Sequence, residues 1–169
     1  VEAGFVALDP ENGAIRAMVG GFNYFESKFN RATQGGRLVG SGIKPLIYTA
    51  ALESGMTPAT LINDSPVVFD QTEGATDWRP QNSSGTFLGP TRLRKALYRS
   101  RNLVSVRLVR ELGIDSVIDI AGRFGLDTAK LPRDLSISLG TASLTPLEMA
   151  ETYAVFANGG FKVKHHLID

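Results

Sequence analysis

Gly40-Ser41-Gly42-Ile43-Lys44-Pro45 is the stretch that decides the fold, because a helix is expected to begin there. Pro45 fits the first turn, where a missing backbone N–H removes no helical bond, and Gly55 is a natural C-terminal stop. Tyr48 and Leu52 are apolar on the far side, so we predict a helix that is buried all round. Its main apolar stripe has the expected helical spacing and comprises Ile43, Leu46, Ile47, Ala50 and Ala51.

Ser41 and Lys44 stand three residues apart at the start of this helix, which places them on the same face. A lysine is disfavoured there, because the helix N-terminus is already positive and a lysine in an apolar sequence is rarely buried without a partner. Both effects favour the neutral amine, which can deprotonate a nearby serine hydroxyl. The spacing alone leaves two interpretations open: a reactive serine with its base, or a serine cap followed by a lysine that reaches solvent.

Size and composition indicate one ordinary soluble domain of 169 residues, 43% of them hydrophobic and 21% charged. The net charge of +1 gives no indication of nucleic acid or an acidic membrane as a partner. The absence of cysteine excludes disulfides and thiolate chemistry, and no apolar run is long enough to span a bilayer. The first residue is valine and no signal peptide is visible, so we expect a piece of a longer protein.

The N-terminal part predicts a β-hairpin. Residues 5–8 and 14–19 have strand character, and Asp9-Pro10-Glu11-Asn12-Gly13 between them is strong turn chemistry. A lone hairpin is barely stable in water, so it should belong to a larger sheet. Residues 22–38 look like a loop, and 62–89 look irregular with a short extended piece at 67–69 and a long loop from 77 onward. That loop holds the only tryptophan of the sequence, Trp78. We interpret it either as an apolar side chain packed under the loop or as a substrate contact.

Helical patterns fill the second half of the chain. Thr91 is the expected cap of one helix, and a second follows Ser100-Arg101-Asn102 and stops at Gly113. The basic residues of the first of these helices have the spacing of a solvated face rather than a binding patch. Asp115 is the expected cap of a short helix that ends at Gly125, and residues 136–143 are interpreted as a buried loop.

The last predicted helix begins at Thr145-Pro146-Leu147-Glu148, a capping box with proline at the first helical position. Asn158-Gly159-Gly160 ends it. His165 and His166 are adjacent, so on an extended segment they point to opposite faces and make a poor metal pair. We expect an exposed tail and no metal site there.

Two motifs in order, Ser41-x-x-Lys44 and Ser100-x-Asn102, resemble the first two of the three that mark penicillin-binding proteins and class A β-lactamases. Further segments resemble the bifunctional (class A) penicillin-binding proteins, and the similarity covers essentially the whole chain. These segments are Ala7-Leu8-Asp9-Pro10, Gly13-Ala14-Ile15, Met18-Val19-Gly20-Gly21, Phe29-Asn30-Arg31-Ala32, Trp78-Arg79-Pro80-Gln81-Asn82 and residues 145–160.

The resemblance implies an α/β (α+β) fold of the β-lactamase and transpeptidase kind, with a helical subdomain over 41–160 and part of an antiparallel sheet that includes a hairpin over 4–20. It also implies a serine D,D-transpeptidase, in which Ser41 attacks the carbonyl between two terminal D-alanines of a peptidoglycan stem peptide. Lys44 is then the base and Ser100 relays a proton to the leaving amine, and the mechanism needs no metal or organic cofactor. Asn102 holds Lys44 and the substrate amide. The expected substrate contacts are Ser41, Ser100, Asn102 and Trp78.

The third motif of the family, Lys-Thr-Gly or Lys-Ser-Gly, does not occur in these residues. We therefore expect the chain to be the N-terminal part of a transpeptidase domain, inactive by itself. The expected partners are stem peptides ending in D-Ala-D-Ala, β-lactam antibiotics and the remainder of the domain. The resemblance places the membrane-anchored parent in a bacterial cell envelope, at the outer face of the inner membrane.

Two rival functions stay open at this point. One keeps the serine chemistry on the same scaffold and makes the protein a β-lactamase or a D,D-carboxypeptidase. The other is a binding or assembly module without turnover, which the missing third motif favours for the fragment as it stands. Covalent labelling by a fluorescent penicillin would distinguish an enzyme from a binding module. The ratio of hydrolysis to aminolysis of a D-Ala-D-Ala peptide would distinguish the carboxypeptidase from the transpeptidase.

Overall fold

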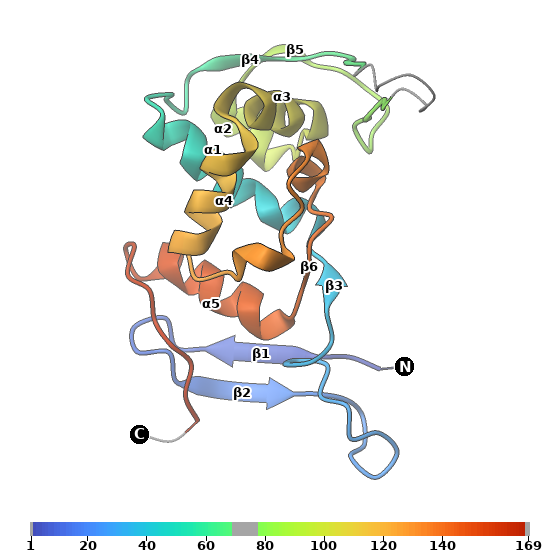
Figure 1. Ribbon diagram of the computed structural model, residues 1–169, viewed down its shortest axis with the longest axis vertical. Helices are drawn as coiled ribbons and strands as arrows, with labels where there is room; N and C mark the ends of the chain where they lie inside the picture. The colour runs from blue at the N-terminus through green and yellow to red at the C-terminus, as the bar shows by residue number, and fades with distance from the viewer. Residues whose placement is uncertain (1, 69–77, 168–169) are drawn as a thin grey trace. The chain divides into compact units, whose positions relative to one another are not determined.

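The computed structural model describes residues 2–68 and 78–167 of the chain (Figure 1). The chain divides into two compact units. The first comprises Val1–Val39, Ala121–Leu131 and Ala142–Asp169, and the second comprises Gly40–Ile120 and Pro132–Thr141. Among the described residues, no helix is both long and apolar enough to cross a membrane.

The first unit contains the predicted hairpin. Strands β1 (Phe5–Leu8) and β2 (Ile15–Val19) pair antiparallel, with Phe5 opposite Val19 and Leu8 opposite Ile15. Gly13 in the connecting turn has a positive φ of 85°, and a side chain there would collide with the backbone oxygen of Lys164. The hairpin prediction is confirmed, and the turn has room only for glycine at that position.

Helix α5 (Pro146–Ala157) contacts β1 in the first unit. Its N-terminus has the predicted capping box: the Thr145 hydroxyl accepts from the Glu148 N–H, and the Glu148 carboxylate accepts from the Thr145 N–H. Two short strands, β3 (Arg37–Leu38) and β6 (Ser143–Leu144), also pair antiparallel. The interpretation of 22–38 as all loop is therefore wrong at its last two residues.

The histidines near the C-terminus do not form the exposed tail that the sequence suggests. The backbone of His166 pairs with the hairpin, accepting from the Ile15 N–H at 2.8 Å and donating to the Gly13 oxygen at 3.2 Å. The His165 ring nitrogen Nδ1 lies 2.7 Å from Oε1 of Glu151 on α5. Both residues are half-buried, because the segment follows the hairpin instead of leaving it.

The second unit is mainly helical. It includes the 3-10 turn η1 (Gly40–Ile43), α1 (Lys44–Glu53), β4 (Leu61–Asp64), β5 (Gly89–Arg92), α2 (Leu93–Tyr98), α3 (Asn102–Leu112) and η3 (Leu135–Leu139). Helix α4 (Ile114–Arg123) begins in this unit, while its residues 121–123 and the 3-10 turn η2 (Thr128–Lys130) belong to the first. All three pairs of strands in the described part of the chain are antiparallel.

Helix α1 packs against α3 and η3 in the core of the second unit. Burying one side chain of this kind contributes about 1.5–3 kcal/mol, so this core holds the helices in place. Leu52 is 47% exposed, so the prediction that α1 is buried all round is wrong at its C-terminal end. The fully buried residues of this core include Ile43, Leu46, Ile47, Leu103, Val104, Leu108 and Ile137.

Strand β4 lies at the start of the region 62–89 that the sequence suggests is irregular, and its partner β5 begins at the last residue of that region. Asn63 and Pro90 are poor strand formers, and they stand opposite each other in this ladder, which explains the weak local signal. Thr91 belongs to β5 and donates its hydroxyl to the Gly89 oxygen, so it does not cap α2. Asp115 lies within the first turn of α4 rather than at its cap. Residues 69–77, with the rest of the expected extended piece, lie outside the described residues.

Candidate active site

The turn η1 presents Ser41 next to Lys44. In a 3-10 turn the side chains at i and i+3 eclipse each other, so these two residues lie on one side of the helix start. Ser41 is exposed, whereas Lys44 is only 1% exposed. The serine hydroxyl is therefore open to a substrate, and the lysine amine lies behind it inside the protein.

Two glycines fix the backbone at this turn. Gly40 donates its N–H to the Gly140 oxygen at 2.9 Å, and Gly140 has a positive φ of 70°. A Cβ on Gly140 would lie 2.0 Å from the Gly40 oxygen, which is impossible without movement of the backbone. The loop around Gly140 thus supports the residue immediately before Ser41.

Ser100 occupies a break between two helices. The Ser100 N–H donates to the Leu97 oxygen and the Arg101 N–H donates to the Ala96 oxygen, both at 2.9 Å, which is the Schellman pattern that ends a helix. The left-handed position of this motif usually holds glycine, yet here it holds Ser100 with φ 51°. Such an outlier at a non-glycine residue suggests that the side chain itself is needed.

Four side chains from these elements meet in one hydrogen-bonded cluster. The Lys44 ammonium donates to the Ser100 backbone oxygen at 2.7 Å, to the Ser100 hydroxyl at 2.9 Å and to Asn102 Oδ1 at 2.7 Å. The Ser100 hydroxyl in turn donates to the Ser41 hydroxyl at 3.0 Å. Within the described residues Lys44 and Ser41 share no direct hydrogen bond, so Ser100 is the link between them. We call this set the serine–lysine cluster.

The pKa of Lys44 is lowered from its ordinary value to about 8. Burial is the main cause, since it disfavours the charged amine, and the nearby positive charge of Arg101 adds to it. Lys44 is also the first residue of α1, where the helix dipole opposes a cation. An amine with this pKa can give up and take back a proton near neutral pH.

Trp78, the fifth expected site residue, is half-buried and precedes Pro80. None of the hydrogen bonds that join the serine–lysine cluster involves it. The same segment does reach the cluster at Gln81, whose backbone oxygen accepts from the Asn102 side chain at 2.9 Å. Of this segment, the sequence pointed only to Trp78 as a site residue. It gave no signal for Gln81 or Asn82, because their contacts with Asn102 depend on the fold.

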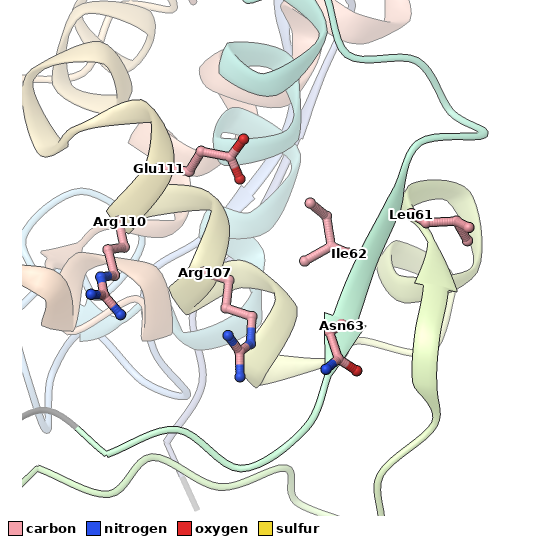
Figure 2. A pocket seen from close by; sticks show the side chains of 6 residues that line it. All are labelled: Leu61, Ile62, Asn63, Arg107, Arg110 and Glu111. Carbon is pink, nitrogen blue, oxygen red and sulfur yellow. The ribbon is translucent and has the colours of Figure 1, made fainter.

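A separate hollow lies between β4 and α3 and involves no member of the serine–lysine cluster. Arg107, which lines it, donates to the backbone oxygens of Ser65 and Pro66 and so ties α3 to the chain after β4. Figure 2 shows the side chains that line this hollow: Leu61, Ile62, Asn63, Arg107, Arg110 and Glu111. In the described part of the chain, no group of three or more His, Cys, Asp or Glu side chains is placed to hold a metal ion.

Residues 3–169 match the family of penicillin binding protein transpeptidase domains, so this chain belongs to that family. Penicillin-binding protein 1A of Pseudomonas aeruginosa is 49% identical over 168 residues, which are 99% of this chain and 20% of that protein. Penicillin-binding protein 1A of Vibrio cholerae is 54% identical over 161 residues, or 95% of this chain and 19% of that protein. The chain thus spans about a fifth of the length of these curated relatives.

Solved structures confirm the fold class. Penicillin-Binding Protein 1A from Haemophilus influenzae superposes with a TM-score of 0.95 at 46% identity, covering 99% of this chain and 25% of that one. PonA1 from Mycobacterium tuberculosis in complex with penicillin V gives a TM-score of 0.84 at 29% identity, covering 96% of this chain and 45% of that one. The combination of helices and antiparallel strands is therefore the β-lactamase and transpeptidase fold.

Proposed function

We propose that this chain carries the nucleophile and base of a serine D,D-transpeptidase that cross-links peptidoglycan stem peptides. The observation that carries the proposal is the unbroken path from Ser41 Oγ through Ser100 Oγ to Lys44 Nζ, with steps of 3.0 and 2.9 Å. Membership of the transpeptidase family supports the reaction class.

The hydrogen bonds of Lys44 indicate where its proton goes. Two of its acceptors, the Ser100 backbone oxygen and Asn102 Oδ1, can only accept. A neutral amine keeps two N–H donors for them, and its lone pair then faces the Ser100 hydroxyl. Lys44 can therefore accept the Ser100 proton while Ser100 accepts the proton of Ser41. The path suits general-base activation of Ser41.

The reaction then proceeds in two steps. The Ser41 oxygen forms a bond to the carbonyl carbon between two D-alanines, and the C–N bond to the last alanine breaks. The proton held by Lys44 returns through Ser100 to the leaving amine, so D-alanine departs as a neutral amine. An amine of a neighbouring stem peptide then forms a bond to the ester carbonyl carbon, and the C–O bond to Ser41 breaks. The proton that this amine loses passes through Lys44 and Ser100 to the Ser41 oxygen, which restores the hydroxyl. The backbone N–H of Ser41, in the turn before α1, is the proposed donor to the developing oxyanion.

The proposed ligands are stem peptides ending in D-Ala-D-Ala and β-lactams, which would acylate Ser41. The complex of PonA1 with penicillin V supports the antibiotic half of this proposal. Asn102 would contact the substrate amide, and Trp78 would add a substrate contact beside the cluster. The remainder of the transpeptidase domain would supply the Lys-Thr-Gly strand and the second oxyanion donor.

The same proposal also concerns the cellular location of the parent protein. Relatives named penicillin-binding protein 1A from bacteria support a cell-envelope location at the outer face of the inner membrane. A membrane anchor would then lie elsewhere in the parent protein. The rival functions are a β-lactamase or D,D-carboxypeptidase on the same scaffold, and a binding module without turnover.

The test uses the full-length parent protein. Fluorescent penicillin should label the wild type, and mass spectrometry should place the adduct on Ser41. Ser41→Ala should abolish labelling, while Ser54→Ala, at the other end of α1, should label normally. Aminolysis of a D-Ala-D-Ala peptide in excess of hydrolysis supports the transpeptidase over the carboxypeptidase. Undiminished labelling of Ser41→Ala would overturn the proposal.

A further inference from the structure

We propose that Asn82 is a positioning residue for the serine–lysine cluster, acting through Asn102 at the start of α3. This inference rests on the proposed function. Asn82 lies 20 residues before Asn102 in the sequence, on the loop that precedes β5, and it is only 4% exposed. Its side chain bonds to the backbone of Asn102, and none of its hydrogen bonds within the described residues ends on a side chain of the serine–lysine cluster.

The first turn of α3 depends on Asn82 for its cap. The residue before the helix, Arg101, makes no side-chain capping bond. Instead, Asn82 Oδ1 accepts from the N–H groups of Asn102 at 2.9 Å and Leu103 at 3.3 Å. These are two of the donors that every helix leaves without an intrahelical partner. A side chain from a distant loop therefore fixes the backbone that carries Asn102.

The amide of Asn82 is itself held on all sides. Its Nδ2 donates to Asp64 Oδ1 at 2.8 Å and to the Thr86 oxygen at 3.1 Å. With the two bonds that its oxygen accepts, the side chain uses its full hydrogen-bonding capacity. A flipped amide would lose all four bonds. The Asn82 side chain is therefore held in one orientation by its hydrogen bonds.

A buried ion pair anchors this support. Asp64 is fully buried, and its Oδ2 accepts from Arg101 Nε at 2.6 Å and from the Leu88 N–H at 3.0 Å. Arg101 also donates to the Ser84 hydroxyl at 3.0 Å and to the Thr86 oxygen. We call Asp64, Asn82 and Arg101 the support network. It joins the end of β4, the loop before β5 and the residue between Ser100 and Asn102.

The neighbouring residue Gln81 completes the arrangement. Its backbone oxygen accepts from Asn102 Nδ2 at 2.9 Å, so the Asn102 amide oxygen must face the other way, toward Lys44. Residues 81 and 82 therefore set both the backbone and the amide orientation of Asn102. Misplacing a catalytic group by about 1 Å can cost a hundredfold in rate, so loss of this support should be visible in acylation.

The experiment measures the acylation rate constant of the full-length protein with a chromogenic β-lactam. Asn82→Ala should lower that constant by about ten- to a hundredfold, because the backbone that carries Asn102 would no longer be held in place. Asn63→Ala removes the same side chain from an exposed position on β4 and should stay within about twofold of wild type. Unfolding curves confirm that each variant is folded at the assay temperature.

A double-mutant cycle separates positioning from general destabilisation. If Asn82 acts through Asn102, the double variant of Asn82→Ala and Asn102→Ala should be no slower than Asn102→Ala alone. Losses that multiply, or an Asn82→Ala variant that acylates like wild type, would overturn the inference. Where Asn82→Ala does not fold, Asn82→Ser is judged by the same two criteria. If Ser41→Ala still labels, the proposed function fails instead.

Discussion

Lys44 and Arg101 are two buried cations of the same unit with opposite surroundings. The Arg101 guanidinium is paired with the Asp64 carboxylate at 2.6 Å, whereas the three hydrogen bonds of Lys44 all end on neutral oxygens. A buried charge with a counter-charge is held permanently, and one without it can lose its proton. The support network therefore contains a buried ion pair that serves structure, and the serine–lysine cluster contains an amine that can exchange a proton.

The largest expected effect tests the exchangeable cation. Lys44→Met keeps most of the length of the side chain and removes the base, so penicillin acylation should fall by about a hundred- to ten-thousand-fold. The fold should survive, because no buried charge loses its partner. Labelling rates and circular dichroism measure both properties, with Lys95→Met on the exposed face of α2 as the control. Normal acylation by Lys44→Met would remove Lys44 as the base.

Arg101→Met tests the permanent cation and should mainly affect stability. Removing one partner of a buried ion pair leaves the Asp64 carboxylate uncompensated, which costs about 3–5 kcal/mol of unfolding free energy. Urea unfolding measures this loss. The exposed Arg94→Met should change stability by less than about 0.5 kcal/mol. Equal stability of the two variants would show that the Asp64 pair has no structural role.

The pH dependence of acylation tests the pKa of Lys44, which is about 8. The reactive form is the neutral amine, so the rate should rise as the pH rises through 8 and level off above it. For one titrating base of this pKa the rise from pH 6 to pH 9 is roughly a hundredfold. Stopped-flow acylation over pH 6–10 measures the profile. A flat profile across this range would contradict a Lys44 base.

The smallest expected effect concerns the backbone at Ser100. Ser100→Ala and Ser100→Gly both remove the hydroxyl and should both acylate slowly. Only alanine keeps the penalty of the left-handed conformation, so the glycine variant should be more stable than the alanine variant by about 1 kcal/mol. Thermal unfolding of the two variants side by side measures the difference. An alanine variant that is equally stable would show that Ser100 is not strained.

The sequence could predict what depends on neighbours in the chain. The hairpin, the capping box of α5 and the shared face of Ser41 and Lys44 all follow from spacing and turn chemistry within a few residues. The pairing of Ser100 and Asn102 with Lys44 came from the family resemblance, because a contact across more than 50 residues has no local signal.

The support network could not be predicted, for the same physical reason. Asp64 bonds to a residue 18 positions away and to another 37 positions away. Its sequence context indicates only the start of the region 62–89 that looks irregular. Thr91 is a case in which the local signal was present but misleading. Its residue type favours a helix cap, yet it lies in strand β5. In both cases hydrogen bonds between distant segments determine the local structure, and neither composition nor periodicity contains information about such bonds.

The contact between Gly140 and Gly40 has a consequence for genetics. Because the two backbones touch, a mutation at Gly140 changes the position of Ser41 from 99 residues away without altering any reacting group. Its phenotype would imitate a nucleophile mutation while every motif residue stays intact. An inspection of sequences that checks only the motif residues would classify such an allele as wild type.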